Sequence, residues 1–416
     1  MTTRDPCIRR TTCRLCGGSE LQPVLPIPAT PPGDHYVSAE ELAAEQPAYP
    51  LDIVLCAQCG LSQLAFTVQP DILYGRYSYV SSVSLGLNEH FQSYAREVLG
   101  RINPARKSLV IDIGSNDGSL LRAFQNEGMS VLGIDPAEEI AQKATEAGIE
   151  TWTGYFSTDL AGKIRGRRGT ASIITANNVT ANVDDLPGFM AGVRSLLAPD
   201  GVFILESSYL LDVIEKSLVE TVFHEHLSYY SVRPLESFFQ QAGLQLIDVQ
   251  RVPTKGGSIR CTVQIAGAMR PVSRSVTDLI ELEIRAGLYR AETFAEYGVR
   301  MEAVKNTLQT VLRDLRAQRK TIAGYGASVG VTTLLYLFDL GQSLDFIADD
   351  NPGKQGKFSP GHHIPVLSSS ALYERNPDYV LILAWAYAGP IMKKHRAFCL
   401  GGGRFIVPLP EVKIIE

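Results

Sequence analysis

The residues best suited to acid–base chemistry in this chain are gathered in one short segment, Phe223–Ser231, which reads Phe-His-Glu-His-Leu-Ser-Tyr-Tyr-Ser. Two imidazoles, a carboxylate and two phenols so close together are costly to bury unless they pair with one another or with a ligand. The segment is not the H-E-x-x-H motif of a zinc helix, because alternate residues point the same way only on a strand or an extended loop. A solvated surface turn and a pair of metal-ligating histidines are the alternatives. The sequence favours an acid–base site built on Glu225 and His226.

Two Cys-x-x-Cys-Gly motifs predict a structural metal centre. Each motif is closed by a glycine that permits a tight turn. Four thiolates from two such pairs make a closed tetrahedral zinc site, which leaves no coordination position for a substrate. A redox-active pair is the alternative, but redox motifs do not normally occur twice with a matching glycine. The predicted zinc ligands are Cys13, Cys16, Cys56 and Cys59.

A strand, a glycine turn and a helix predict where a nucleotide-like cofactor binds. The mostly apolar run Ser108–Ile113 breaks into Gly-Ser-Asn-Asp-Gly at 114–118 before a helical stretch, and such a turn offers backbone N–H groups to a ligand. The spacing differs from the G-x-G-x-x-G pattern of dinucleotide-binding proteins. Asp135 ends the next predicted strand and follows Gly114 by 21 residues, the interval at which a carboxylate accepts hydrogen bonds from ribose hydroxyls.

Two further predicted strands deliver polar residues to the same edge of the sheet. The run Ser172–Ala176 is followed by two asparagines, and the run 202–205 is followed by Glu206. Ligands of open α/β sheets bind at the carboxyl ends of the strands. The residues expected to hold the cofactor are Gly114, Ser115, Asn116, Asp117, Gly118, Asp135, Pro136, Asn177 and Asn178.

A second unit of the same kind is predicted near the C-terminus. Residues Thr321–Ser328 contain a Gly-Tyr-Gly-Ala turn, and a strand over 344–350 follows. This turn either holds the pyrophosphate of a nucleotide, with Lys354 or Lys255 as the charge partner, or only packs against its neighbour. Between the two units, apolar residues at helical spacing over about 273–318 predict one long or two shorter connecting helices.

Composition excludes several classes of function. A chain of 416 residues with 45% hydrophobic residues and a net charge of −5 describes a globular protein of two or three domains. That charge argues against nucleic acid as the main partner. No apolar run reaches membrane-spanning length, and the N-terminal residues lack the apolar core of a signal peptide. We therefore expect a cytoplasmic protein, monomeric because no exposed apolar repeat demands a partner.

Taken together, these motifs resemble the S-adenosylmethionine-dependent sugar C-methyltransferases of antibiotic deoxysugar biosynthesis. The resemblance covers almost the whole chain and rests on the paired cysteine motifs, the turn at 112–118, the cluster at 224–231 and the glycine turn at 324–327. It implies an α/β fold with four parts. These are a small N-terminal zinc-binding module (1–75), a central Rossmann-like class I methyltransferase domain (76–270), a helical connector (271–320) and a C-terminal Rossmann-like domain (321–416).

The resemblance also implies a reaction. S-adenosylmethionine would donate a methyl group to C-3 of a dTDP-linked 4-keto-deoxysugar, whose C-3 hydrogen is acidic because the keto group can carry the charge as an enolate. Such a step requires a base tuned near neutral pH and a donor aimed at the developing oxyanion. We expect His226 to be the base, oriented or tuned by Glu225, with Tyr77 nearby. No metal is needed for this step.

At two positions the chain departs from the family pattern. Asn182 stands where relatives usually carry His, and Phe223 stands where they usually carry Tyr. Asn can donate a hydrogen bond but cannot shuttle a proton, and Phe has no hydroxyl. We expect Asn182 to act as a neutral donor to the keto or enolate oxygen, and proton transfer to be roughly ten- to a thousand-fold less efficient.

Two other functions stay open on the sequence alone. An inactive protein that still binds S-adenosylmethionine and a sugar nucleotide would explain Asn182 and Phe223, although the intact Glu225 and His226 argue against it. A zinc-containing NAD-dependent oxidoreductase would explain two Rossmann-like units, although the missing G-x-G-x-x-G pattern argues against that.

Overall fold

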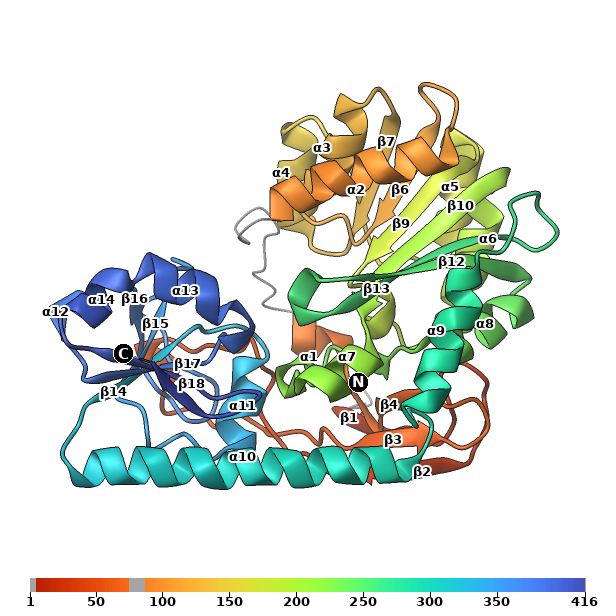
Figure 1. Cartoon of the computed structure of the whole chain (residues 1–416). Coiled ribbons are helices and arrows are strands. Elements are labelled where there is room, and N and C mark those ends of the chain that lie inside the picture. The colour runs from red at the N-terminus through yellow and green to blue at the C-terminus, as the bar shows by residue number, and fades with distance from the viewer. Residues whose placement is uncertain (1–4, 75–86, 416) are drawn as a thin grey trace.

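The computed structural model describes residues 5–74 and 87–415. Within these residues the chain forms a small N-terminal module, a seven-stranded sheet flanked by helices and a six-stranded C-terminal sheet. Figure 1 shows the two larger units side by side, with the N-terminal sheet below the seven-stranded unit and one long helix, α10 (Ala291–Ala317), beneath both. The predicted catalytic residue Tyr77 lies outside the described residues.

The N-terminal module is an antiparallel sheet that includes a strand from much later in the chain. Three of its strands are consecutive, and β11 pairs with β4 through the register Ser228 to Gln63. Because β11 belongs to the segment that carries the two histidines, backbone hydrogen bonds join that segment to the cysteine module. The elements of the module are β1 (Cys7–Arg9), β2 (Leu21–Leu25), β3 (Ile53–Cys56), β4 (Ser62–Leu64), β5 (Phe66–Val68), α1 (Pro70–Tyr74) and β11 (Ser228–Tyr229).

The seven-stranded sheet has the order β8-β7-β6-β9-β10-β13-β12, and β13 runs antiparallel to both of its neighbours. Strands covered on both faces bury both sets of side chains, which explains the unbroken apolar runs seen in the sequence. Helices α2 and α3 pack on one face through Tyr94 and Phe124, and α5 and α6 pack on the other through Ile164 and Phe189. The strands are β6 (Leu109–Ile113), β7 (Ser130–Asp135), β8 (Thr151–Thr153), β9 (Ala171–Asn177), β10 (Leu197–Ser208), β12 (Leu244–Val252) and β13 (Ser258–Ile265).

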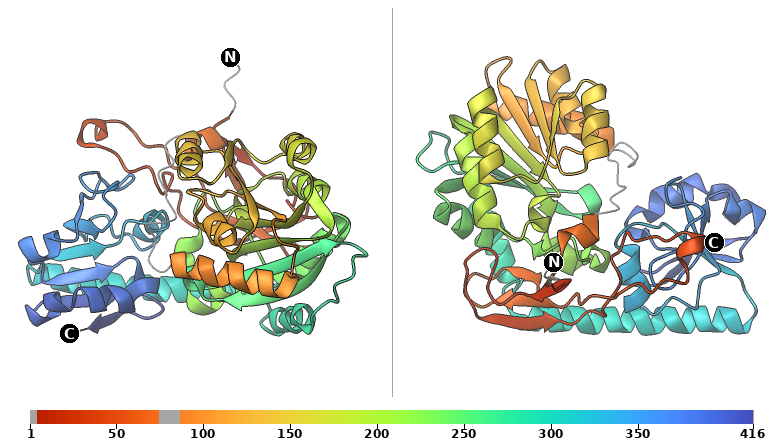
Figure 2. Two further views of the ribbon diagram at one scale, coloured as in Figure 1. Left: turned by 90° about the horizontal axis from the view of Figure 1, so that it is seen from above. Right: turned by 180° about the vertical axis from the view of Figure 1, so that it is seen from behind.

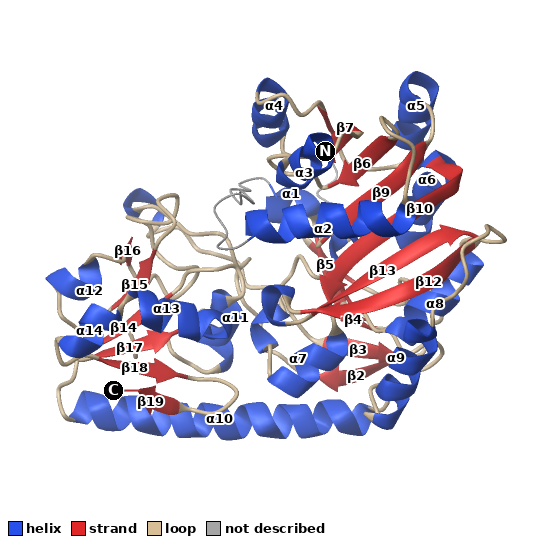
Figure 3. Cartoon of the chain, turned by 45° about the horizontal axis from the view of Figure 1, so that its top comes forward, coloured by secondary structure: helices blue, strands red, loops and turns tan. Residues whose placement is uncertain are grey.

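Helices connect these strands and cover the sheet, as Figure 3 shows. Several begin where a side chain caps free backbone N–H groups, as Asp185 does for α6. The helices of this unit are α2 (Leu87–Ile102), α3 (Ser119–Asn126), α4 (Glu138–Glu146), α5 (Thr158–Arg168), α6 (Leu186–Leu196), α7 (Leu210–Lys216) and α8 (Val232–Gln241).

The C-terminal sheet has the order β16-β15-β14-β17-β18-β19, parallel except for β19. Its first strand, β14, ends at the predicted Gly-Tyr-Gly-Ala turn. The strands are β14 (Ile322–Tyr325), β15 (Phe346–Asp349), β16 (Val366–Ser368), β17 (Tyr379–Ile382), β18 (Arg404–Val407) and β19 (Lys413–Ile415), and the helices are α11 (Val331–Leu337), α12 (Ala371–Glu374), α13 (Ala388–Lys394) and α14 (Arg396–Leu400).

The predicted helical connector is two helices, α9 (Arg274–Arg285) and α10. The rear view in Figure 2 shows α10 beneath both larger units, with the N-terminal module beside it. One continuous cluster of buried apolar residues contains Leu55 of the N-terminal module, Leu205 of the central sheet and Leu334 of the C-terminal unit. Within 5–74 and 87–415, no helix combines the length and apolar character needed to cross a membrane. The predicted domain boundaries stay predictions.

Candidate functional site

The glycine turn after β6 has the conformation that its sequence predicts. Gly114 and Gly118 have φ angles of 73° and 76°, in the left-handed region that side chains with a β-carbon rarely adopt. A β-carbon on Gly114 would lie 2.3 Å from Val179 Cγ2, so the turn packs directly against the loop that follows β9. Asp117 accepts hydrogen bonds from the N–H and hydroxyl of Ser119 and so stabilises the start of α3.

Asp135 holds this turn in place. Its Oδ2 atom accepts a hydrogen bond from Asn116 N at 2.9 Å, and its Oδ1 atom accepts one from Ala137 N at 2.9 Å. Burial raises the pKa of the carboxyl, and these two hydrogen bonds oppose the rise. A carboxylate oxygen can accept a second hydrogen bond, so the predicted role of Asp135 toward ribose hydroxyls is compatible with its contacts. Pro136 is exposed beside it.

Buried polar atoms at this edge of the sheet have no hydrogen-bond partner within the described residues. They include Ser115 Oγ and Asn177 Nδ2, and such atoms are costly to bury unless a ligand or water pairs with them. Asn178 follows with a φ of 56°, and its N–H donates to Glu206 O at 2.7 Å. The donors and acceptors at the turn therefore fit a polar, nucleoside-containing cofactor such as S-adenosylmethionine.

Two acidic residues near this edge differ from the sequence expectations. Asp112, outside the predicted set, is buried, accepts a hydrogen bond from Thr175 Oγ1 at 2.6 Å, and has its pKa raised to about 7 by burial. It belongs to the motif at 112–118, which was the available signal. Glu206 lies inside β10 rather than beyond its end, where it forms a 2.9 Å ion pair with Arg260. It is nevertheless level with Asn177 at the end of β9, so it reaches this edge, where its carboxylate is paired with the buried cation of Arg260.

The His-Glu-His segment is a turn that separates its two histidines. His226 N donates to Phe223 O, and His224 points into the core, where its Nε2 atom lies 3.0 Å from Tyr49 O. Within the described residues, the group of side chains that could hold a metal ion is formed by the four cysteines and includes neither histidine. The burial of His224 also differs from a solvated surface turn.

His226 is held so that one ring nitrogen is left as a base. Its Nδ1 atom donates to Thr221 O at 2.9 Å, so in the neutral ring the lone pair resides on Nε2. The Phe223 ring lies against it, with ring centres 3.9 Å apart. Burial and, to a smaller extent, the charge of Lys255 lower the pKa of His226 to about 4, which is below the near-neutral value expected of the base from the sequence. Glu225 was expected to orient this ring, but the observed contact comes from Thr221.

Glu225 is partly buried next to these groups. Burial and the charge of Asp34 raise its pKa to about 7, against the opposing charges of Lys255 and Lys354. Asp34 belongs to the N-terminal module, Lys255 to the connection between β12 and β13 of the central unit, and Lys354 to the C-terminal unit. Glu225 therefore lies where the three parts of the chain meet.

Tyr74, at the end of α1, is a candidate site residue outside the predicted set. Burial and the negative charge of Glu225 raise the pKa of its phenol, and a hydrogen bond with Asn182 opposes the rise. Asn182 lies in the one-turn helix η3 (Thr180–Asn182), and its Oδ1 atom has no partner within the described residues. Glu225, Tyr74 and Asn182 thus lie together. Tyr74 begins the tyrosine-rich run that contains Tyr77, which was the signal for it.

The four predicted cysteines form a cluster suited to zinc. The sulfurs of Cys13 and Cys59 lie 3.5 Å apart, those of Cys16 and Cys56 lie 3.6 Å apart, and all four lie within 4.8 Å of one another. Zinc–sulfur bonds of about 2.3 Å in a tetrahedron place sulfurs about 3.8 Å apart. The cysteines would hold a closed, structural zinc ion.

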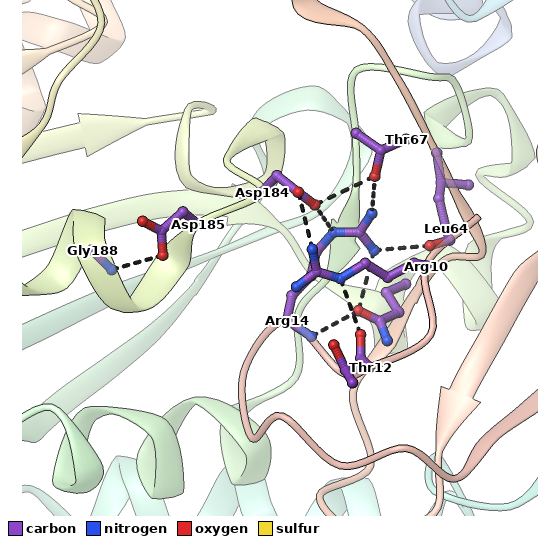
Figure 4. Close-up of polar contacts among 9 residues, drawn as sticks. Arg10, Thr12, Arg14, Leu64, Thr67, Asp184, Asp185 and Gly188 are labelled. Atoms are coloured by element: carbon purple, nitrogen blue, oxygen red, sulfur yellow. Dashed lines mark hydrogen bonds and ion pairs between the residues drawn. The ribbon is translucent and has the colours of Figure 1, made fainter. Parts of the chain in front are cut away.

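Arg14, inside the first cysteine motif, connects this motif to the loop after η3, and Figure 4 shows its polar contacts. Its side chain is fully buried and donates to Asp184 Oδ1 at 2.9 Å, Thr67 Oγ1 at 2.7 Å and Leu64 O at 2.8 Å. A cavity of about 280 Å³ beside it is lined in part by Arg10 and Asp184. Because Asp184 follows Asn182 by two residues, the cysteine module is tied to the loop that carries Asn182.

Three families match successive parts of the chain. A family described as a putative zinc binding domain matches residues 13–74, a methyltransferase domain matches residues 87–249, and a C-methyltransferase C-terminal domain matches residues 253–410. The C-methyltransferase NovU of Streptomyces niveus is 35% identical over 405 residues, which cover 97% of this chain and 96% of NovU.

Solved structures of methyltransferases are similar to a part of the chain. A magnesium protoporphyrin IX methyltransferase from Synechocystis with bound SAH matches with a TM-score of 0.35 and 16% identity, over 47% of this chain and 91% of its own. An S-adenosylmethionine-dependent methyltransferase from Clostridium acetobutylicum matches with a TM-score of 0.35 and 13% identity, over 47% of this chain and 96% of its own.

The three family matches, the match to NovU and the geometry agree with the main predictions. The α/β fold with a cysteine module and a Rossmann-like methyltransferase domain is confirmed, as is an enzyme that transfers a methyl group to carbon. Structural zinc is confirmed by the cysteine cluster and the zinc-binding match, and S-adenosylmethionine is the methyl donor that the glycine turn fits. The chain belongs to the C-methyltransferase family.

Proposed function

We propose that this chain transfers a methyl group from S-adenosylmethionine to C-3 of a dTDP-linked 4-keto-deoxysugar through an enolate. The observation that carries the proposal is the 2.9 Å hydrogen bond from His226 Nδ1 to Thr221 O, which leaves the Nε2 lone pair as the basic site. An imidazole in this tautomer, next to a carboxyl group of raised pKa, is equipped to remove a proton from carbon beside a carbonyl group. The substrate, the roles of the site residues, the monomeric state and the cytoplasmic location stay predictions.

The cofactor would lie at the carboxyl edge of β6, β7 and β9. The turn from Gly114 to Gly118 offers backbone N–H groups, Asp135 offers carboxylate lone pairs, and Ser115 and Asn177 offer the buried polar atoms that lack partners. S-adenosylmethionine supplies an electrophilic methyl group, which the nucleophilic C-3 carbon accepts.

Proton removal is the step that the histidine segment performs. The C-3–H bond breaks, the proton passes to His226 Nε2, and the electron pair forms the C-3–C-4 double bond of the enolate while the charge moves to the 4-oxygen. Burial keeps the ring of His226 neutral before this step, because its pKa is lowered to about 4. The negative enolate then stabilises the imidazolium, which opposes the effect of burial.

The oxygen that becomes negative needs a donor or a positive charge nearby. The amide of Asn182 can donate a hydrogen bond, and the cation of Lys255 acts on both His226 and Glu225. Asn182 cannot also transfer a proton, and Phe223 offers only its ring to His226. Turnover is therefore expected but reduced.

The nucleotide end of the substrate would lie on the C-terminal unit. Gly326, in the turn after β14, has a φ of 102°, and a β-carbon there would lie 2.6 Å from Ala384 Cβ. Lys354 lies at the same turn, where its Nζ atom donates to Ala327 O and forms a 2.6 Å ion pair with Asp34. A pyrophosphate can share this cation with Asp34.

The test follows labelled methyl transfer from S-adenosylmethionine to dTDP-4-keto-6-deoxyhexoses that carry either a hydroxyl or an amino group at C-3. We expect label in the sugar with the parent chain, and about ten- to a thousand-fold faster transfer after Asn182→His with Phe223→Tyr. His226→Asn, which keeps the size of the side chain near that of imidazole, should abolish transfer.

The outcomes separate the proposal from its alternatives. If only the variant with Asn182→His and Phe223→Tyr labels the sugar, while the parent chain still binds S-adenosylmethionine and the sugar nucleotide, the parent is an inactive binding protein. Absence of label from parent and restored variant with both sugars would refute the proposed substrate class. Undiminished transfer by His226→Asn would refute the assigned base.

A further inference from the structure

The start of α11, in the C-terminal unit, contacts the loop that precedes the histidine segment. Thr333 is 1% exposed, and its hydroxyl donates to Val222 O at 2.6 Å across 111 residues of sequence. Its neighbour Thr332, also buried, donates to Gly33 O of the N-terminal module at 3.0 Å. Consecutive threonines therefore bind two different parts of the chain.

Two glycines allow the backbones to approach closely at this junction. A β-carbon on Gly330 would lie 1.9 Å from Glu220 O, and one on Gly33 would lie 2.2 Å from Val329 O. Distances below about 3 Å are not found for real side chains. The loop at 220–222 is thus in direct contact with the C-terminal unit, with no space for a side chain between them.

The same loop supplies the hydrogen-bond acceptor of His226. Thr221 O accepts from His226 Nδ1, and Val222 O, one peptide further along, accepts from Thr333. The two carbonyl groups flank the α-carbon of Val222, so the hydrogen bond from Thr333 to Val222 O restrains the position of the residue that follows Thr221 O. Without that acceptor, the ring of His226 loses the contact that selects its tautomer.

We propose that Thr333 is a positioning residue that acts from the C-terminal unit and, through the loop at 220–222, holds His226 with its proton on Nδ1. The inference rests on the proposed function in that His226 is taken as the base. The C-terminal unit then has a part in proton removal as well as in substrate binding. The methyl-donor site does not depend on this contact, because the turn at Gly114 is built from the central sheet.

The test compares three variants at adjacent positions. Thr333→Val keeps the shape of the side chain and removes its donor, Thr333→Ser keeps the donor, and Thr332→Val removes the neighbouring contact to Gly33 instead. Exchange of the C-3 hydrogen of the keto sugar with deuterated water, measured without S-adenosylmethionine, reports proton removal alone. The dissociation constant of S-adenosylmethionine reports the cofactor site.

We expect Thr333→Val to slow this exchange roughly ten-fold or more, a part of the hundred- to ten-thousand-fold that a positioned base contributes. Thr333→Ser should stay near the parent rate, Thr332→Val should fall by less than Thr333→Val, and all three should bind S-adenosylmethionine with the parent's affinity. If Thr333→Val exchanged the C-3 hydrogen of the keto sugar at the parent rate, the inference would be overturned.

A spectroscopic measurement tests the inference independently of turnover and of the stability of any one variant. Nitrogen-15 chemical shifts of histidine distinguish a protonated Nδ1 from a protonated Nε2. The parent should show His226 protonated on Nδ1, and Thr333→Val should show a mixture of tautomers. A parent ring protonated on Nε2 would overturn the inference, whereas a parent that neither exchanges nor methylates any keto sugar would refute the proposed function and leave this readout intact.

Discussion

His226 and Glu225 share surroundings that favour their neutral forms. Burial lowers the pKa of the imidazole to about 4 and raises the pKa of the carboxyl to about 7, because in each case the charged form loses hydration. Near pH 7 an unprotonated imidazole therefore lies beside a carboxyl group that is poised to exchange its proton. Neighbouring titratable groups with displaced pKa values are typical of acid–base sites.

The raised pKa of Glu225 predicts how stability depends on pH. Between its ordinary pKa of 4.5 and its folded pKa of about 7, the folded chain binds more protons than the unfolded chain, so the free energy of unfolding falls as pH rises through this window. Glu225→Gln does not titrate there. The variant should therefore gain stability relative to the parent between about pH 4.5 and pH 8, as measured by urea unfolding.

The control for this prediction is Glu296→Gln, which changes an exposed carboxyl on α10. Its difference from the parent should stay the same at both pH values. If Glu225→Gln behaved in the same way, the carboxyl of Glu225 would titrate alike in the folded and unfolded chain, and its role as a proton-exchanging group would have to be abandoned.

At the scale of elements, the turn between β6 and α3 makes the sharpest prediction for cofactor binding. Gly114→Ala places a β-carbon in the left-handed region, which costs about 1–2 kcal/mol, and 2.3 Å from Val179 Cγ2. We expect the affinity for S-adenosylmethionine, measured by calorimetry, to fall about ten-fold or more. The matched control is Gly162→Ala, inside α5, where a β-carbon meets nothing within 4 Å.

Gly162→Ala should leave cofactor affinity unchanged and raise the free energy of unfolding by about 0.5–1 kcal/mol, because Ala is favoured over Gly within a helix. Cofactor affinity at the parent value in Gly114→Ala would mean that cofactor binding does not depend on the conformation of this turn. The assignment of this turn as the cofactor site would then be wrong.

Local signals in the sequence were sufficient for the elements that depend on neighbouring residues. Apolar runs predict strands β6, β7 and β9. Glycines predict the turn at Gly114 and the turns that close the two cysteine motifs, and these glycines have positive φ angles. Contacts between residues far apart in the chain have no comparable signal in the local sequence. The contact of Thr333 with Val222 spans 111 residues, and β11 joins a sheet whose other strands lie before residue 65.

The histidine segment shows the same limit at a single site. Its residue types predicted an acid–base cluster, but the sequence could not show that His224 faces the core and that a backbone carbonyl, Thr221 O, orients His226. Backbone acceptors have no side chain to mark them. Tyr74 lies outside the predicted set because its importance comes from the charge of Glu225 and a hydrogen bond with Asn182, which lie on other elements.

At the scale of the whole molecule, the cysteine module is packed into the rest of the chain and is not an appendage. β11 joins the histidine segment to its sheet, and buried apolar residues run without a break from the module into both larger units. Loss of zinc should therefore disturb the central unit as well as the module. Arg14 is the polar side chain through which this coupling can be tested.

Arg10 and Arg14 both donate to Asp184, at 3.0 Å and 2.9 Å, but they differ in burial. The side chain of Arg14 is 0% exposed and that of Arg10 is 28% exposed. Arg14→Gln leaves acceptors such as Leu64 O without their donor, and should lower the free energy of unfolding by about 3 kcal/mol, since a hydrogen bond to a charged group contributes about 1.5–3 kcal/mol. Arg10→Gln breaks an exposed pair and should cost less than about 1 kcal/mol.

Urea unfolding followed by circular dichroism, with zinc content measured on the same samples, tests whether the cysteine module and the central unit unfold together or separately. If the module and the central unit are coupled as the contacts indicate, Arg14→Gln should retain its zinc, unfold in one transition at lower urea and transfer methyl groups more slowly, because the loop from Asn182 to Asp184 is no longer held. Arg10→Gln should match the parent in all three properties. Two separate transitions in Arg14→Gln, with methyl transfer unchanged, would show that the cysteine module does not support the site.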